Sequence, residues 1–332
     1  IGIGGWRPHS AEATAECRYG DCKDMSTLLI SRFRQAGLTA YPCLVLTRGE
    51  GRTDPEHPGF AFNHVIAMLL YEGDTIWVDP TQNQCPFGTI PYSIEDIDVL
   101  VVTDNGGAMR HIRGSEPEDN QTNRTIAMHV GPDRIARSTM TLETKGQYAR
   151  ILRGNLIGAN SDQTRNLIDR QFHGANQTYR ILTRDVLGLE EMYDPVVVRV
   201  TCESVKPVRK LGSTVYCEPF FAEGLASFED EDLTDRVFPL NTYYPDRNTT
   251  TIVVTWDSSL AADSICLPPD DSVSFDFGGF SCRSELTADT VRIALEKTCR
   301  TYQIMPERFD EFDEFRDRLD AMIKTRLKFI YH

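Results

Sequence analysis

One stretch decides how the first part of this chain folds: Arg18-Tyr19-Gly20-Asp21-Cys22-Lys23-Asp24-Met25. A Gly-Asp turn leads directly into a cysteine, and an amphipathic run follows. Its apolar residues recur at steps of three and four, at Met25, Leu28, Leu29, Phe33 and Ala36. The run stops at Gly37, a residue that readily ends a helix in the left-handed conformation. The pattern predicts a helix that begins near Cys22 and buries one face.

The position of Cys22 in the first helical turn has a chemical consequence. Unpaired backbone N–H groups and the positive end of the helix dipole favour a thiolate over a thiol there. Because the thiolate is the nucleophilic form, Cys22 is a candidate nucleophile for acyl transfer.

Two apolar segments downstream supply the partners that such a nucleophile needs. Residues 62–70 read as a strand with His64 at its entry, and residues 75–81 read as a second strand that ends near Asp79. The turn Glu72-Gly73-Asp74 between them favours an antiparallel pair, in which His64 and Asp79 can lie side by side. The helix carrying Cys22 can then pack on this sheet and direct its first turn at His64.

Three segments resemble the core motifs of the transglutaminase-like superfamily: Gly20-Asp21-Cys22-Lys23-Asp24, Phe62-Asn63-His64-Val65-Ile66 and Trp77-Val78-Asp79-Pro80-Thr81. That superfamily contains transglutaminases, bacterial cysteine proteases and amidases that share a papain-like triad. The resemblance covers roughly residues 1–104. It implies that Cys22 is the nucleophile, that His64 is the general base and acid, and that Asp79 orients the imidazole.

The Gly-Asp-Cys-Lys-Asp form resembles bacterial envelope proteins that carry this core between two β-rich domains. The resemblance therefore implies a periplasmic or secreted protein. It also implies upstream parts outside this sequence: the first helix of the core, a preceding β-rich domain and an export signal. We expect a peptide or protein substrate and no cofactor. A metal site at Cys22 and His64 is disfavoured, because too few other ligands lie nearby in the sequence.

Two further residues flank the candidate triad. Trp77 could form an apolar wall of the site, and Asn63 could supply a hydrogen-bonding group. Alternatively, Trp77 packs in the core and Asn63 satisfies backbone groups. The sequence leaves both alternatives open.

Composition narrows the class of protein. The chain has 332 residues, 40% of them hydrophobic, and a formal net charge of −14. It shows no cluster of Lys and Arg of the kind that binds phosphate backbones, so we expect no nucleic-acid partner. No apolar run reaches the roughly 18 residues of a transmembrane segment. The acidic balance favours a neutral or basic substrate or partner. Nothing in the sequence indicates an oligomeric state.

A chain of 332 residues is too long for one core, so we expect an α+β protein of two or three domains. We expect a transglutaminase-like (papain-like) core at residues 1–105, a linker at 106–123, and a β-rich domain with a helical insertion at 124–237. A C-terminal β-rich domain that ends in a helix is expected at 238–332, and the β-rich region is expected to be sandwich-like. The helical insertion is expected at residues 147–156 and 161–172, and the last helix at about 306–329.

Nine cysteines are a high number, and none form a Cys-x-x-Cys pair. In an oxidising compartment Cys202 with Cys217, and Cys266 with Cys282, could bridge neighbouring strands. Buried free thiols are the alternative, and the sequence leaves the choice open.

The function that follows is thiol-dependent acyl transfer on an amide or peptide bond through a thioester. Hydrolysis of the peptidase or amidase type is favoured. A protein transglutaminase differs only in which nucleophile reaches the acyl-enzyme, so it stays an alternative. The third alternative is an envelope scaffold that retains the fold without catalysis, against which the intact Cys22, His64 and Asp79 count.

Overall fold

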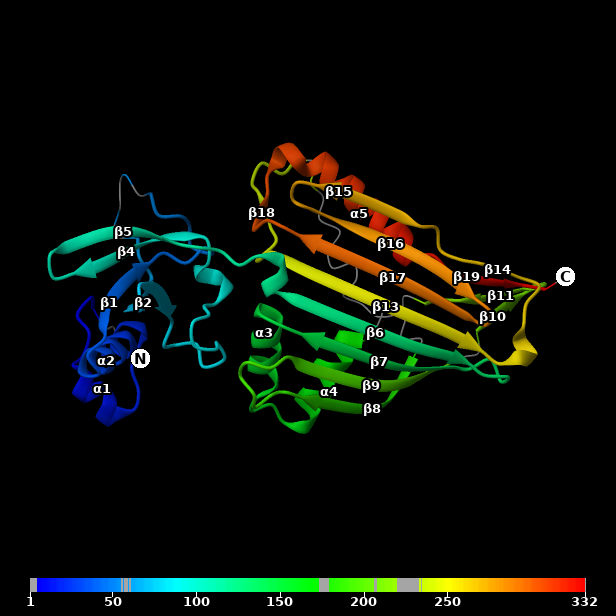
Figure 1. Ribbon diagram of the computed structural model, residues 1–332, viewed down its shortest axis with the longest axis horizontal. Coiled ribbons are helices and arrows are strands. Elements are labelled where there is room, and N and C mark those ends of the chain that lie inside the picture. Colours follow the sequence, from blue (N-terminus) through cyan, green and yellow to red (C-terminus); the bar gives the residue numbers. More distant parts are fainter. Residues whose placement is uncertain are drawn as a thin grey trace. The chain divides into compact units, whose positions relative to one another are not determined.

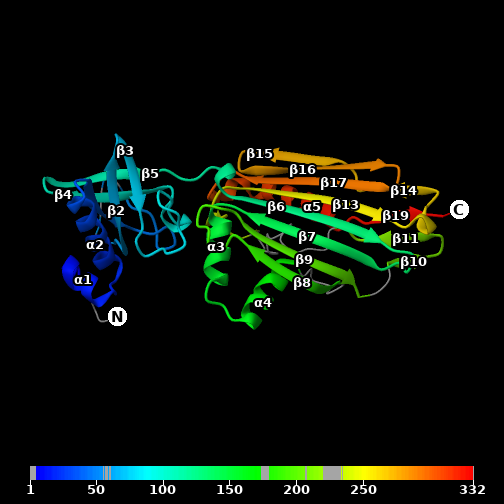
Figure 2. The same cartoon turned by 60° about the horizontal axis from the view of Figure 1, so that its bottom comes forward.

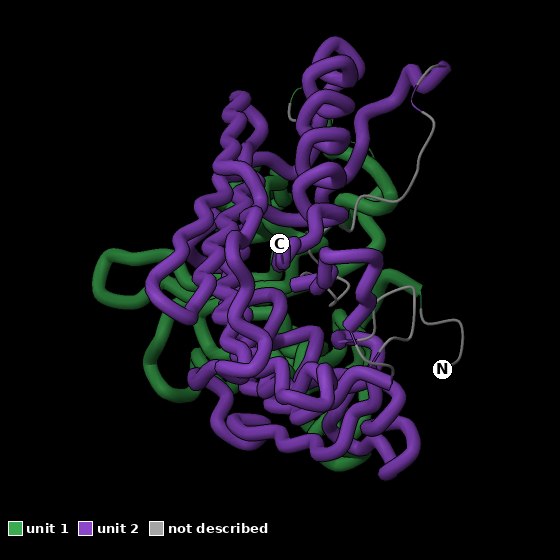
Figure 3. The backbone as a smooth tube through the Cα atoms, turned by 90° about the vertical axis from the view of Figure 1, so that its right-hand side faces the viewer, with its two compact units in different colours: residues 1–115 green, residues 116–332 purple. Residues whose placement is uncertain are grey.

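The computed structural model of the chain describes residues 5–54, 56, 59, 61–172, 179–205, 208–219, 233 and 235–331. Across these residues it is a mixed α+β protein with five α-helices, and strands predominate. The chain divides into two compact units, residues 1–115 and 116–332 (Figures 1 and 3). In the described residues no helix has both the length and the apolar character needed to cross a membrane.

Unit 1 contains two helices on a five-stranded sheet, counted over its described residues. The elements are α1 (Ala11–Cys17), α2 (Cys22–Gln35), β1 (Thr39–Val45), β2 (His64–Tyr71), β3 (Asp74–Val78), the 3-10 turn η1 (Tyr92–Ile94), β4 (Ile97–Thr103) and β5 (Gly106–Ile112).

Helix α2 begins at Cys22, as the sequence predicted, because a capping box precedes it. The Asp21 side chain accepts from the backbone N–H of Asp24, and the Asp24 side chain accepts from the N–H of Asp21. The helix ends at Gln35, shortly before Gly37, whose φ of 79° is in the left-handed region. The buried face matches the expected one only in part, since Leu29 and Phe33 pack against a hydrophobic cluster of the sheet as predicted. Ser26 and Ile30 are buried, while Met25 and Leu28 are only half-buried.

The polar Ser26 is tolerated in this packed interface because it is satisfied there. Its Oγ donates a hydrogen bond of 2.9 Å to the backbone carbonyl of Val65 on β2. This bond joins the helix that carries Cys22 to the strand that carries His64.

The sheet of unit 1 has the strand order β3-β2-β1-β4-β5, and its neighbouring strands pair antiparallel. Strands β2 and β3 form the expected hairpin, and both Glu72 and Gly73 of its turn have positive φ, as a tight two-residue hairpin loop requires. Residues 106–112, which we assigned to a linker, instead form β5 and pair with β4. The sequence does not show this strand clearly, because Gly106 and Gly107 at its start have no side chains that could alternate between apolar and polar.

Unit 2 contains the remaining elements, η2 to β19. They are η2 (Pro117–Asp119), β6 (Gln121–Val130), β7 (Ala136–Thr144), α3 (Gln147–Leu156), α4 (Ser161–Phe172), β8 (Tyr179–Leu187), β9 (Val196–Ser204), β10 (Arg209–Leu211), β11 (Thr214–Cys217), β12 (Leu240–Asn241), β13 (Asp246–Trp256), η3 (Ser258–Leu260), β14 (Ser264–Cys266), β15 (Asp271–Phe275), β16 (Gly278–Thr287), β17 (Thr290–Cys299), β18 (Gln303–Ile304), η4 (Pro306–Arg308), α5 (Phe309–Ile323) and β19 (Leu327–Ile330).

An eight-stranded sheet with the order β15-β16-β17-β13-β6-β7-β9-β8 organises unit 2. Strands β6 and β13 are parallel neighbours at its centre, with Ile126 opposite Ile252. This differs from the expected division into domains 124–237 and 238–332, because the two halves share one sheet and one core. Pairing between strands more than 100 residues apart leaves no local signal in either strand.

One face of this sheet is covered by α3, α4, α5 and a small sheet of order β10-β11-β19-β14 (Figures 1 and 2). Unit 2 is sandwich-like only where the small sheet packs against the large one. There the rings of Trp256 on β13 and Phe329 on β19 lie 5.0 Å apart. Helices α3 and α4 have the predicted bounds. The last helix is shorter than expected: it ends at Ile323, and β19 follows it.

All nine cysteines lie in the described residues, and none of them forms a disulfide. The two candidate pairs do not lie on neighbouring strands. Cys202 is on β9 of the large sheet and Cys217 on β11 of the small one, whereas Cys266 is on β14 and Cys282 on β16. Cys202, Cys217 and Cys282 are buried as thiols, and burial raises the pKa of each. Cys266 is exposed.

Candidate active site

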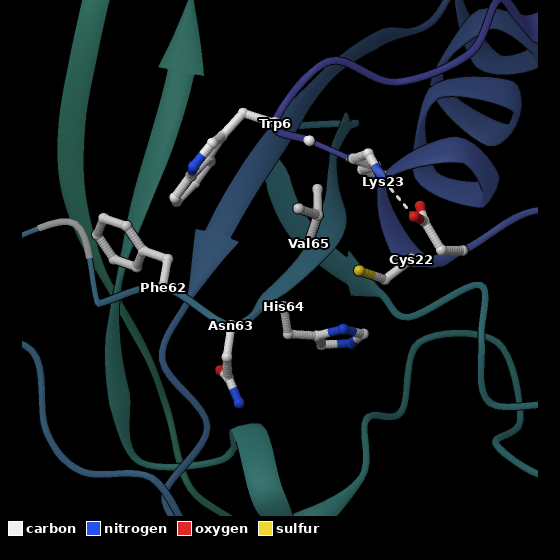
Figure 4. Close-up of a pocket in the computed structure, with 9 residues that line it drawn as sticks. Trp6, Cys22, Lys23, Phe62, Asn63, His64 and Val65 are labelled. Atoms are coloured by element: carbon white, nitrogen blue, oxygen red, sulfur yellow. Dashed lines mark hydrogen bonds and ion pairs between the residues drawn. The ribbon is translucent and has the colours of Figure 1, made fainter. Parts of the chain in front are cut away.

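The start of α2 holds a thiol next to an imidazole. Cys22 is the first residue of the helix, so its N–H has no intrahelical acceptor. Its sulfur lies beside the ring of His64, the first residue of β2 (Figure 4). A hydrogen bond with the His64 side chain lowers the pKa of Cys22, and this outweighs the opposing effect of burial. The site thus favours a thiolate at Cys22.

A buried carboxylate holds the other side of the imidazole. The Nε2 of His64 is 2.9 Å from Oδ2 of Asp79, whose side chain is only 1% exposed. Burial alone would lower the pKa of His64, but the hydrogen bonds with Asp79 and Cys22 outweigh it and raise the pKa to about 9. Because Asp79 occupies Nε2, the Nδ1 nitrogen is the one left for Cys22.

Asp79 is itself held in place by the turn that follows β3. Its Oδ1 accepts hydrogen bonds from the backbone N–H of Thr81 at 3.0 Å and from the Thr81 hydroxyl at 2.7 Å. Burial raises the pKa of Asp79, but the bonds from His64 and Thr81 overcome this and hold the pKa below its usual value. The pair therefore combines an ionised carboxylate with a protonated imidazole near neutral pH.

A second carboxylate holds the turn before Cys22. Asp24 is buried and accepts hydrogen bonds from the backbone N–H of His9 at 2.8 Å, from the N–H of Asp21 at 3.3 Å, and interacts with the His9 ring at 3.1 Å. These bonds attach the segment before α1 to the first turn of α2. Gly20 packs against this carboxylate, because a Cβ added there would come within 2.6 Å of the Asp24 Cβ.

We expect Gly20→Ala to displace the turn before Cys22. Relieving the overlap must shift Asp24 or the backbone of the turn, at a cost of about 1–3 kcal/mol in the free energy of unfolding. Denaturant unfolding followed by tryptophan fluorescence measures this cost. Gly49→Ala is the control, since a Cβ there meets nothing within 4 Å. Equal stability of the two variants would contradict the tight packing of Gly20.

A surface pocket of about 280 Å³ surrounds the sulfur (Figure 4). Its lining is Gly5, Trp6, Asp21, Cys22, Lys23, Phe62, Asn63, His64 and Val65. Trp6, Lys23 and Phe62 were not singled out from the sequence. For Phe62, its place two residues before His64 was a usable signal, but nothing local marks Trp6 as close to Cys22.

The two flanking residues occupy different settings. Asn63 lines the pocket, but its side chain is bonded to Thr47: its Oδ1 accepts from the backbone N–H of Thr47, and its Nδ2 donates to the Thr47 hydroxyl, both at 2.9 Å. Trp77 lies on β3 opposite Met68 and packs against the hydrophobic core that contains Cys43 and Ile66. This corresponds to the packing alternative for Trp77.

Comparison with known proteins gives a likeness of fold. No protein-family model matches the sequence, and no curated protein matches it. Among solved structures, the chain is similar to one from Parabacteroides distasonis described as a "putative protease", with a TM-score of 0.50 and 11% sequence identity. The match covers 96% of this chain but 46% of that protein, so the chain corresponds to less than half of its length.

Proposed function

We propose that this chain is a thiol-dependent hydrolase that cleaves an amide or peptide bond through Cys22, His64 and Asp79. The observation that carries the proposal is the 2.9 Å contact of a buried carboxylate with the imidazole that faces a thiol of lowered pKa. The likeness of fold to a protein described as a "putative protease" and the resemblance of three motifs to the transglutaminase-like superfamily support it. We also propose, from that resemblance, a periplasmic or secreted location.

In the acylation step, the Cys22 thiolate attacks the carbonyl carbon and forms a C–S bond. The carbonyl oxygen becomes an oxyanion, and the N–H of Cys22 at the helix start is available to donate to it. The oxyanion collapses, the C–N bond breaks, and the Nδ1–H of His64 gives its proton to the leaving amine. The products are a thioester at Cys22, the free amine and a neutral imidazole.

In the deacylation step, Nδ1 of His64 takes a proton from water, whose oxygen attacks the thioester carbon. The C–S bond breaks, the carboxylic acid leaves, and the thiolate beside an imidazolium is restored. Asp79 holds Nε2 throughout and stabilises the imidazolium. An amine in place of water would give transamidation by the same steps.

The pH profile follows from the two shifted pKa values. The active thiolate–imidazolium pair forms as pH rises through the lowered pKa of Cys22 and is lost as His64 loses its proton at about pH 9. We expect kcat/KM to be bell-shaped, with the alkaline limb near pH 9. Alkylation of Cys22 should not fall on that limb, because the thiolate persists above it. A fall of kcat/KM near pH 6.5, the ordinary value for histidine, would contradict the raised pKa.

The experiment that tests the function uses a tryptic peptide mixture as substrate, with mass spectrometry of the products. We expect new carboxyl termini, and a peptide adduct on Cys22 in acid-quenched samples. Both should be absent from Cys22→Ala. Adding hydroxylamine separates the two acyl transfers, because a transamidase converts most product to hydroxamate while a hydrolase makes mainly free acid. Product formation that persists in Cys22→Ala, or none in the wild type, would contradict the proposal.

A further inference from the structure

The pocket around Cys22 has an aromatic wall formed by Trp6 and Phe62. Trp6 lies before α1 and is 64% exposed, and Phe62 is half-buried two residues before His64. Both rings lie on the same side of the pocket, across Val65 from the sulfur (Figure 4). Two aromatic rings in the lining of one pocket leave contiguous apolar surface open to solvent, and contiguous apolar surface in a pocket is typical of binding sites.

The charges in the lining favour an uncharged ligand. Asp21 and Lys23 form an ion pair, and the Lys23 side chain is only 13% exposed. Their charges compensate each other, and His64 is engaged by Asp79 and Cys22. The pocket lining therefore has no excess of negative charge, although the whole chain has a net charge of −14. What the pocket offers beyond the reacting groups is the indole of Trp6, the ring of Phe62 and the methyl groups of Val65.

The size of the pocket limits what can be bound there. About 280 Å³ is just below the usual range of roughly 300–1,000 Å³ for small-molecule sites. It suits one large side chain together with the bond that Cys22 attacks, and not a second large group. Because the wall and the sulfur share this one pocket, the side chain that covers the wall belongs to a residue next to that bond.

We propose that Trp6 and Phe62 form the subsite for an aromatic or long aliphatic side chain adjacent to the amide that Cys22 attacks. The inference rests on the proposed function, since it names the substrate class of that site: peptides with a large apolar residue at the scissile bond. Trp6 and Phe62 are specificity-determining residues in this scheme, and neither reacts.

The test compares two alkylating reagents, iodoacetamide and N-benzyl iodoacetamide, at each cysteine by peptide mass spectrometry. In the wild type, we expect the benzyl reagent to be preferred at Cys22 by about tenfold relative to its preference at the exposed Cys17 and Cys266, because its ring covers Trp6. In Trp6→Ala this preference should fall to within about twofold of that at Cys17. Phe62→Ala should reduce it as well.

Phe87→Ala is the matched control, because Phe87 is an aromatic residue of the same unit that is 53% exposed and lies outside the pocket lining. It should leave the preference at Cys22 unchanged. An equal benzyl preference at Cys22 and Cys17, or a preference that survives Trp6→Ala, would overturn the subsite. So would a loss in Phe87→Ala of the same size as in Trp6→Ala.

The readout separates failure of the subsite from failure of the proposed function. Alkylation requires only that the sulfur is accessible, so the ratio of the two reagents is measurable whether or not the protein turns over peptides. Rapid alkylation of Cys22 without a benzyl preference overturns the subsite and leaves the proposed function standing. A benzyl preference in a protein that makes no Cys22-dependent product overturns the function and supports the apolar subsite.

Discussion

His64→Ala will slow the alkylation of Cys22 by iodoacetamide at pH 6 by about 10- to 100-fold. In the wild type, the hydrogen bond with His64 is the largest influence that lowers the pKa of Cys22. Without it, burial raises the pKa of Cys22 by more than the remaining hydrogen bond with the Val65 backbone lowers it. Even an ordinary thiol is only about 0.3% ionised at pH 6. The rate follows the thiolate fraction, although a more basic thiolate is a somewhat better nucleophile and offsets part of the loss.

The measurement is the second-order rate at each cysteine, with the exposed thiols of Cys17 and Cys266 as internal references. The matched control is His111→Ala. His111 is an exposed histidine of the same unit whose Nδ1 is 3.1 Å from Asp98, so it forms a similar pair away from Cys22. Wild-type Cys22 should react faster than both references, and His111→Ala should not change this. Equal alkylation rates at Cys22, Cys17 and Cys266 would favour a scaffold over an enzyme.

Asp79→Asn will lower kcat/KM for the peptide substrate by roughly 10²- to 10⁴-fold while leaving the fold intact. An amide cannot satisfy both neighbours of this carboxylate. If its oxygen stays with the N–H and hydroxyl of Thr81, its NH₂ group faces His64 and favours the wrong tautomer. If it turns to His64, its NH₂ group meets the N–H of Thr81. In either orientation the negative charge that stabilises the imidazolium is lost.

A second readout distinguishes this role from a general loss of structure. Since Asp79 raises the pKa of His64, its replacement should move the alkaline limb of the activity profile from about pH 9 to lower pH. Asp98→Asn, which alters the exposed pair with His111, is the control and should keep both the activity and the limb. A loss of activity without movement of the limb would show that Asp79 acts through packing alone.

Much of the candidate site was predictable because its parts carry local signals. The Gly-Asp turn and the spacing of apolar residues placed Cys22 at a helix start. The hairpin turn at Glu72 and Gly73 placed His64 on one strand of a pair and Asp79 at the end of the other, one residue beyond β3. Trp6 was not predictable, since its approach to Cys22 depends on bonds between His9 and Asp24 rather than on any periodicity. Ser26 was missed for a related reason: a serine on a helix reads as solvent-facing until the carbonyl it bonds is known.

The sequence by itself determined several elements of this protein: where α2 begins, where α3 and α4 begin and end, and the hairpin of β2 and β3. Caps, turns and side-chain periods act within a few residues, so they are written into short stretches of chain. Only the tertiary structure decided that β6 and β13 join two expected domains in one sheet, that the nine described cysteines form no disulfide, and that Trp6 lies in the same pocket as Cys22. These outcomes depend on which surfaces from distant parts of the chain pack together. That packing is set by the whole unit and not by any single segment.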